Sequence, residues 1–174
     1  MKPLKLLICG PVGAGKTTFV STLSEIPVVE TDELASEAIG KEYTTVALDF
    51  GRLTLDEQVL HLFGTPGQDR YHFMWDVLAE GALGLVMLVA GDRPADFGNA
   101  RRILEYVTSR HPIPFVLGVT RQDLEAVWRP AEIALFFGVP AHQVVGLDAT
   151  SPTAAVRVLA QLLTFIRDSE ELVP

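Results

Sequence analysis

Residues 10–17 combine glycines, a lysine and a threonine at a spacing that suits the binding of a polyphosphate. The segment reads Gly-Pro-Val-Gly-Ala-Gly-Lys-Thr, which matches the pattern G-x-x-x-x-G-K-[ST], and it directly follows the apolar run 4–9. The glycines let backbone N–H groups and a helix N-terminus face phosphate oxygens, while Lys16 neutralises charge and the Thr17 hydroxyl can ligate Mg²⁺. A glycine-rich turn that merely starts a helix would not require the Lys-Thr pair. The segment therefore predicts a nucleoside triphosphate site, with lining residues Gly10, Gly13, Ala14, Gly15, Lys16, Thr17 and Thr18.

A second polar segment follows a later apolar run and could select the base. Thr120-Arg121-Gln122-Asp123 comes directly after residues 114–119, where the carboxyl end of a parallel strand would open on a ligand crevice. The Asp123 carboxylate can accept hydrogen bonds from guanine N1 and N2, whereas adenine has an acceptor at N1 and no amine at C2. A charged acceptor left unpaired costs on the order of 1 to 3 kcal/mol or more, so we expect guanine to be preferred. The alternative is an aspartate that only caps a turn.

The elements that must position these residues alternate between strand and helix to the end of the chain. Short apolar runs such as 83–90 and 114–120 are typical of strands buried on both faces of a parallel sheet. Two extended runs, 43–54 and 58–64, are separated by only three residues, which favours a hairpin and hence one antiparallel edge strand. The fold class expected is α/β: three layers, with a six-stranded, mostly parallel sheet and helices on both faces. The expected strands are 4–9, 43–54, 58–64, 83–90, 114–120 and 143–148, and the expected helices are 16–24, 97–110, 130–137 and 152–168.

The composition suits one domain, 1–174, that binds neither nucleic acid nor a membrane. The 174 residues are 48% hydrophobic and carry 14 Lys and Arg against 22 Asp and Glu, a net charge of −8. Nucleic acids and anionic membranes are bound mainly through Lys and Arg. The longest uncharged apolar stretch, 82–90, is too short to span a bilayer, and no signal-peptide pattern opens the chain. We therefore expect a cytoplasmic protein, and the single Cys9 does not contradict a reducing compartment.

The segment 25–42 differs in composition from the rest of the chain. It carries six acidic residues and one basic residue, and it lies between the helix after the phosphate loop and the hairpin. Long connections beside a ligand are often mobile and functional. A solvated, partly helical surface loop explains the composition equally well.

The order of these landmarks resembles the small Ras-like GTPases over nearly the whole chain. Within that superfamily the chain looks like the prokaryotic branch, the MglA-like polarity-switch GTPases and their uncharacterised relatives that pair with roadblock-type partners. The resemblance implies a G domain that binds GTP with Mg²⁺, hydrolyses it slowly to GDP and changes its switch loops with the nucleotide. It also implies a roadblock-type activating partner and an effector that dock on those loops.

The resemblance assigns roles to residues in the middle of the chain. Thr45, with Thr44 as the neighbouring candidate, would close over the γ-phosphate and Mg²⁺. In Gly64-Thr65-Pro66-Gly67-Gln68, the Gly67 N–H would meet the γ-phosphate and Gln68 would orient the attacking water. Threonine also suits any strand, so a structural role for Thr45 stays open. The expected catalytic residues are Gln68, Lys16 and Thr45, and the expected metal ligands are Thr17 and Thr45.

Several positions depart from the family pattern. Gly64 stands where the family has an aspartate beside Mg²⁺, and Asp49 is a conceivable substitute whose direction the sequence does not fix. Thr120 replaces an asparagine and should lose the tethering bonds of the amide, while Arg121 can lie over the base as lysine does. Ala149 and Thr150 follow the last strand, where a backbone N–H meets guanine O6 in the family.

Three further interpretations concern arginines, aromatic residues and the reaction class. Arg70 and Arg52 are the internal candidates for a catalytic arginine, which in this class contributes roughly 10³ to 10⁵ in kcat. The aromatic segment 71–75, which includes Trp75, could dock a partner or could pack beneath the switch.

A metabolic P-loop kinase is disfavoured because no basic lid follows residue 91. A GTP-binding scaffold that does not hydrolyse remains an alternative because of Gly64.

Overall fold

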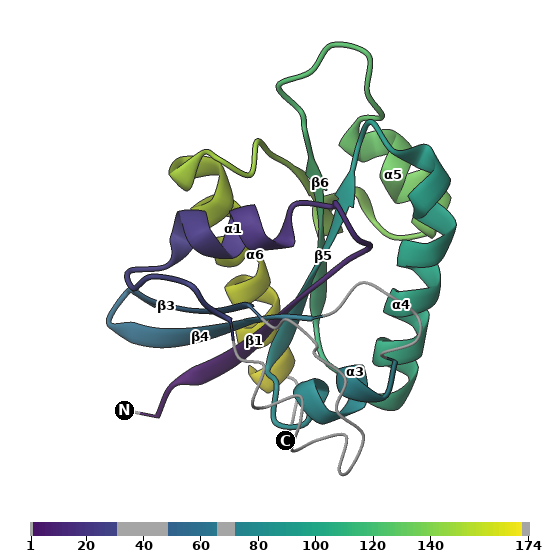
Figure 1. Ribbon diagram of the computed structural model, residues 1–174. Coiled ribbons are helices and arrows are strands. Elements are labelled where there is room, and N and C mark those ends of the chain that lie inside the picture. Colours follow the sequence, from purple (N-terminus) through teal and green to yellow (C-terminus); the bar gives the residue numbers. More distant parts are fainter. Residues whose placement is uncertain (1, 31–48, 66–71, 172–174) are drawn as a thin grey trace.

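A single mixed sheet forms the centre of the molecule. The computed structural model describes residues 2–30, 49–65 and 72–171. Its sheet has the strand order β2-β3-β4-β1-β5-β6-β7, and its central strands are labelled in Figure 1. β1 pairs in parallel with β4 and β5, β5 pairs in parallel with β6, and β6 with β7. The strands are β1 Leu4–Cys9, β2 Val29–Glu30, β3 Asp49–Leu55, β4 Gln58–Gly64, β5 Gly84–Ala90, β6 Phe115–Thr120 and β7 Val144–Gly146.

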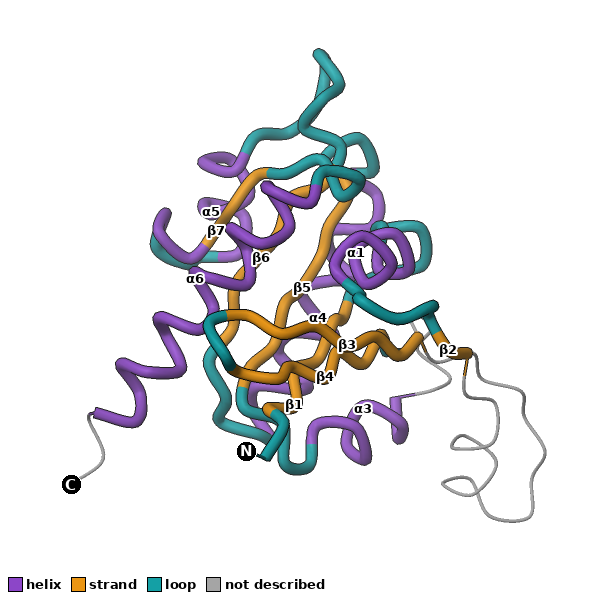
Figure 2. Tube along the Cα trace, turned by 90° about the vertical axis from the view of Figure 1, so that its left-hand side faces the viewer, coloured by secondary structure: helices purple, strands orange, loops and turns teal. Residues whose placement is uncertain are grey.

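The predicted fold class is confirmed, with one added strand. β3 runs antiparallel to β4, as the three-residue connection predicts. The two-residue strand β2 pairs antiparallel with β3 and therefore lies outside it at the edge of the sheet (Figure 2). Two residues are too few to show an apolar period, so the sequence predicted six strands without this one.

Helices cover both faces of the sheet. The α-helices are α1 Lys16–Leu23, α3 His72–Ala79, α4 Phe97–Arg110, α5 Pro130–Phe137 and α6 Pro152–Glu171, and the 3₁₀ turns are η2 Pro94–Asp96 and η3 Ala141–Gln143. The predictions of 97–110 and 130–137 agree with α4 and α5, and α6 extends three residues beyond its predicted end. Among the described helices, none is long and apolar enough to cross a bilayer.

Alternate residues of the central strands build two separate cores. Leu7 and Cys9 of β1 face a cluster with α3, α4 and α5, whereas Leu6 and Ile8 face a cluster with α1 and α6. This alternation is what a strand buried on both faces requires. Figure 1 shows α1 and α6 on one side of the sheet and α4 and α5 on the other.

Helix α3 was not predicted from the sequence, and its large side chains pack inward. Met74 and Trp75 are 1% and 3% exposed, and the Trp75 ring meets Tyr106 edge to face at 5.5 Å. Asp76 accepts a hydrogen bond from the Tyr106 hydroxyl at 2.7 Å and lies 3.1 Å from His111 Nε2. Burial alone would raise the pKa of Asp76, but the hydrogen bonds from Tyr106 and His111 hold that pKa below its ordinary value. Of the two interpretations of Trp75, the structure therefore supports packing.

We predict that Trp75→Ala lowers the free energy of unfolding by about 3 to 5 kcal/mol, because the indole leaves a cavity in a closed core. Val77→Ala, on the same helix and 48% exposed, is the matched control and should change it by less than about 0.5 kcal/mol. Urea unfolding of the three proteins makes the comparison. A Trp75→Ala protein as stable as the control would contradict the packing role.

Candidate nucleotide site

The predicted phosphate loop connects the end of β1 to the start of α1. Gly13 and Gly15 have φ angles of +82° and +103°, a left-handed region that side chains rarely adopt, and Gly15 is the N-terminal cap of α1. The backbone thus turns sharply between the end of β1 and the first turn of α1. Such a helix N-terminus is suited to an anion.

The Lys16 side chain folds back onto the phosphate loop. Its Nζ donates hydrogen bonds to the carbonyl oxygens of Gly10 at 2.6 Å and Pro11 at 2.8 Å. Burial lowers the pKa of Lys16 to about 8, and Cys9 and Asp49 offset only part of this effect. The same burial raises the pKa of the Cys9 thiol to about 11. A bound phosphate would stabilise the charge of this buried ammonium further.

The Asp49 carboxylate lies beside Gly64, the position at which the resemblance would place an aspartate. Asp49 and Gly64 are register partners on β3 and β4, and the Thr17 hydroxyl donates a hydrogen bond to Asp49 Oδ2 at 2.6 Å. A β-carbon on Gly64 would lie 3.1 Å from the Asp49 β-carbon and 3.4 Å from Oδ2. The Asp49 side chain therefore fills the space that Gly64 leaves free and brings a carboxylate to Thr17. A hydroxyl and a carboxylate together are donors that suit Mg²⁺, which prefers oxygen ligands.

A cavity of about 210 Å³ opens beside the phosphate loop. It is lined by Ala14, Gly15, Thr18, Thr120, Arg121, Asp123, Asp148, Ala149 and Thr150. Eight of these nine residues are predicted site residues from three separate segments of the chain. The ninth residue, Asp148, was not predicted as a site residue; its Oδ1 accepts hydrogen bonds from the Thr150 N–H at 2.9 Å and from the Thr150 hydroxyl at 2.6 Å. Those two bonds lower the pKa of Asp148 and fix the turn that follows β7.

Thr120 ties the base segment to the phosphate loop, which corrects the expectation that it would lose the tether. Its hydroxyl is buried, donates to the Ala14 carbonyl at 2.9 Å and lies 3.2 Å from the Val89 carbonyl. A hydroxyl on the shorter side chain thus reaches the loop directly. Arg121, at φ +64°, adds a weaker contact from Nη2 to the Gly13 carbonyl at 3.4 Å, and its Nε lies 3.3 Å from Asp92 Oδ1.

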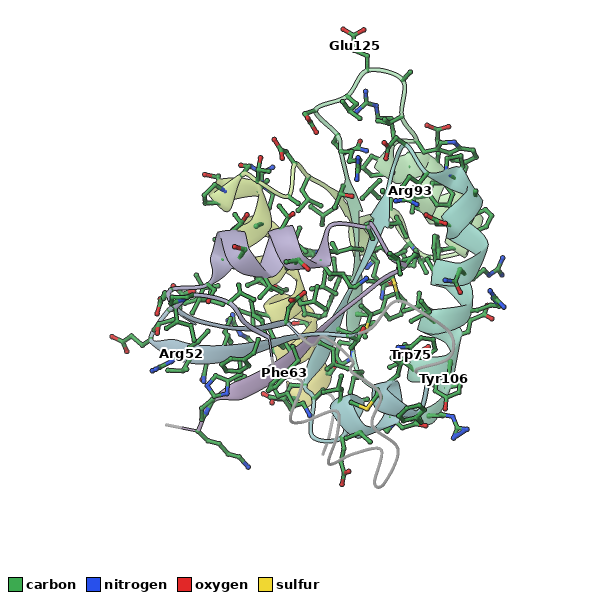
Figure 3. The ribbon with its side chains drawn as sticks, in the orientation of Figure 1. Arg52, Phe63, Trp75, Arg93, Tyr106 and Glu125 are labelled. Carbon is green, nitrogen blue, oxygen red and sulfur yellow. The ribbon has the colours of Figure 1, made fainter. Side chains whose placement is uncertain are left out.

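Several predicted residues lie outside the described part of the chain. These are Thr44, Thr45, Gly67, Gln68 and Arg70, together with most of the acidic segment 25–42. Their roles stay predictions. Arg52 is described; it is exposed on β3 and lies apart from Arg93 (Figure 3), and its role as a catalytic arginine also stays a prediction.

Arg93 is a neighbour of the loop that sequence reasoning missed. A β-carbon on Gly13 would overlap Arg93 Nη1 and would lie 3.1 Å from its Cζ. The signal available in the sequence was the position of Asp92-Arg93 just after the apolar run that forms β5, at the same edge of the sheet as the phosphate loop.

Comparisons with known proteins support a nucleotide-binding protein of this fold. The model of a family described as "Conserved hypothetical ATP binding protein" matches residues 28–171. The uncharacterised protein MJ1339 of Methanocaldococcus jannaschii is 36% identical over 91 residues, which are 50% of this chain and 51% of that protein, so the chain spans about half the length of this relative.

A solved structure matches the fold over nearly the whole chain. The G domain of the T. maritima FeoB iron transporter superposes with a TM-score of 0.70 at 16% identity, covering 94% of this chain and 99% of that one. At this identity the likeness concerns the fold, which is that of a P-loop G domain.

We predict that Thr120→Val lowers the free energy of unfolding by about 1 to 3 kcal/mol, because it removes the buried hydroxyl that the Ala14 and Val89 carbonyls share. Thr120→Ser keeps the hydroxyl and is the control, expected to lose less than about half as much. Urea denaturation of both variants tests the tether. A Val variant as stable as the wild-type protein would show that the hydrogen bond contributes nothing.

Proposed function

The chain belongs to the family described as conserved hypothetical ATP-binding proteins, and we propose that it is a GTP-binding molecular switch that slowly hydrolyses GTP to GDP. It is a nucleotide-binding P-loop protein with the fold of a G domain. The finer proposal concerns the base, the metal ion and the reaction. It includes membership of the MglA-like branch, a single G domain over residues 1–174 and a cytoplasmic location.

The observation that carries the guanine assignment is the position of Asp123. Asp123 lines the same cavity as Ala14 and Gly15, so one ligand can contact both Asp123 and the phosphate loop. A carboxylate there pairs with the N1 and N2 donors of guanine and would face the N1 acceptor of adenine. The family description names ATP, which makes ATP the second candidate. The pairing of donors and acceptors supports guanine over adenine.

Each part of the site has a role in this proposal. Backbone N–H groups of residues 13–17 and Lys16 bind the phosphate chain, and Thr120 and Arg121 hold the loop against the base segment. Gln68 orients a water that attacks the γ-phosphorus, the bond to the β-phosphate oxygen breaks, and GDP and phosphate leave. Gly67 donates its N–H to the γ-phosphate.

Mg²⁺ fits the donors that the chain offers. Thr17 and Asp49 would hold it, with Thr45 as a further ligand, and when bound it would neutralise charge on the β- and γ-phosphates. Asp49 thereby replaces the carboxylate that Gly64 lacks. This exchange weakens the case for a scaffold that binds GTP without hydrolysing it.

The proposed switch works with protein partners. Hydrolysis by the chain alone is slow because no catalytic arginine is assured, so a roadblock-type activating partner and an effector would act on the segments near Thr45 and Gln68. The net charge of −8 argues against nucleic acid as a partner. Direct membrane insertion is not part of the proposal.

The experiment that tests this function has two steps. Nucleotide is first released from the denatured protein and identified by chromatography, and phosphate release is then measured with GTP or ATP, in Mg²⁺ or in EDTA. The proposal expects bound guanine nucleotide and slow, Mg²⁺-dependent release from GTP. Preference for ATP would contradict the guanine assignment, tightly held GTP without release would favour the scaffold, and several turnovers per second without a partner would contradict a dependent switch.

The metal assignment is tested by Asp49→Asn, which keeps the shape of the side chain and removes its charge. We expect the Mg²⁺ concentration that half-maximally slows GDP dissociation to rise by roughly 10- to 100-fold, with dissociation in EDTA unchanged. Asp56→Asn, at the tip of the same hairpin, is the control. An unaltered Mg²⁺ requirement in Asp49→Asn would remove this carboxylate from the metal site.

A further inference from the structure

Arg93 reaches back from the end of β5 to the phosphate loop. Its backbone N–H donates to the Ala90 carbonyl at 3.0 Å and so fixes the turn before η2. Its Nε forms an ion pair with Asp96 Oδ2 at 2.9 Å. Figure 3 shows Arg93 at the carboxyl end of β5, where the phosphate loop also lies.

The terminal nitrogens of Arg93 lie over Gly13. A β-carbon added to Gly13 would overlap Nη1 and would lie 3.8 Å from Nη2. The loop therefore leaves room for the guanidinium at a position where any side chain would displace it. The pair with Asp96 uses Nε and spans only three residues, so it does not by itself require the side chain to reach Gly13.

The other cations of the loop already have acceptors. Lys16 Nζ is bonded to the Gly10 and Pro11 carbonyls, and Arg121 contacts Asp92 and the Gly13 carbonyl. For Arg93, the partner found among the described residues is Asp96, through Nε. Its side chain is 46% exposed, so a ligand can reach it from solvent. A guanidinium stays charged at any physiological pH and matches phosphate with two parallel donors.

We propose that Arg93 is a second phosphate-binding cation, whose Nη1 and Nη2 contact the phosphate chain of the bound nucleotide beside Gly13 while Asp96 holds Nε. The proposal rests on the proposed function only in requiring that the site binds a nucleotide, whichever base it carries. Arg93 would thus be an arginine of this chain at the phosphate loop, whereas Arg52 lies on β3, apart from Arg93 (Figure 3). The ligand class is the di- or triphosphate of a nucleoside.

The test compares Arg93→Ala and Arg93→Gln with Arg101→Ala, an exposed arginine on α4 that pairs with Glu105. Fluorescent GDP and GTP give the dissociation constants, and inorganic triphosphate and guanosine compete as probes of the phosphate and base ends. A charge-assisted contact predicts that both Arg93 variants bind GDP, GTP and triphosphate roughly 10- to 100-fold more weakly. Guanosine affinity and the Arg101→Ala protein should remain unchanged.

The outcomes separate this proposal from the proposed function. Wild-type affinity for triphosphate in both Arg93 variants would overturn the contact, and an equal loss for guanosine would show that Arg93 only supports the shape of the loop. If the wild-type protein prefers ATP, the guanine assignment fails, and the same series with ATP tests Arg93. A wild-type protein that binds no phosphate compound would overturn both. Thermal unfolding of each variant checks that it is folded, and Arg93→Gln keeps the length of the stem if Arg93→Ala is destabilised.

Discussion

The parallel pairing of β1, β5 and β6 is the constraint on which the site depends. Cys9 lies opposite Met87, and Ala90 lies opposite Thr120, so the carboxyl ends of the three strands lie together on one side of the sheet. The phosphate loop, the Asp92-Arg93 turn and the Thr120-Asp123 segment leave that edge together. The bond from the Thr120 hydroxyl to the Ala14 carbonyl then joins two of these segments, which are separated by 106 residues in the chain. Because the three segments lie together, one nucleotide could contact the phosphate loop and the base segment at the same time.

Charge at this edge is arranged locally, against the negative balance of the whole chain. The net charge is −8, yet Lys16, Arg93 and Arg121 all lie at the phosphate loop. Burial lowers the pKa of Lys16 to about 8. Asp49 on β3 places a carboxylate beside Thr17 and occupies the space that Gly64 leaves free on the neighbouring strand. The loop thus has basic side chains on one side and the Asp49 carboxylate beside Thr17 on the other.

The sequence predicted those features that periodicity and motif spacing determine. The helices expected at 97–110 and 130–137 correspond to α4 and α5. Helix α3 was missed because 72–79 is apolar on most sides, and β2 because it has two residues. The directions of Thr120, Asp49 and Arg93 depend on which strands become neighbours, and this is decided by the whole sheet. Thr45 and Gln68 lie outside the described residues, so their roles rest on the resemblance alone.

The central claim is that Asp123 selects the base of a nucleotide whose phosphates lie on residues 10–17. The most direct measurement is the ratio of the GTP and ATP dissociation constants, in the wild-type protein and in Asp123→Asn. The account predicts a wild-type preference for GTP of tens- to hundreds-fold, which falls by at least about tenfold in the variant because the amide no longer accepts from both guanine donors. A wild-type preference for ATP, or an unchanged ratio in the variant, would contradict it.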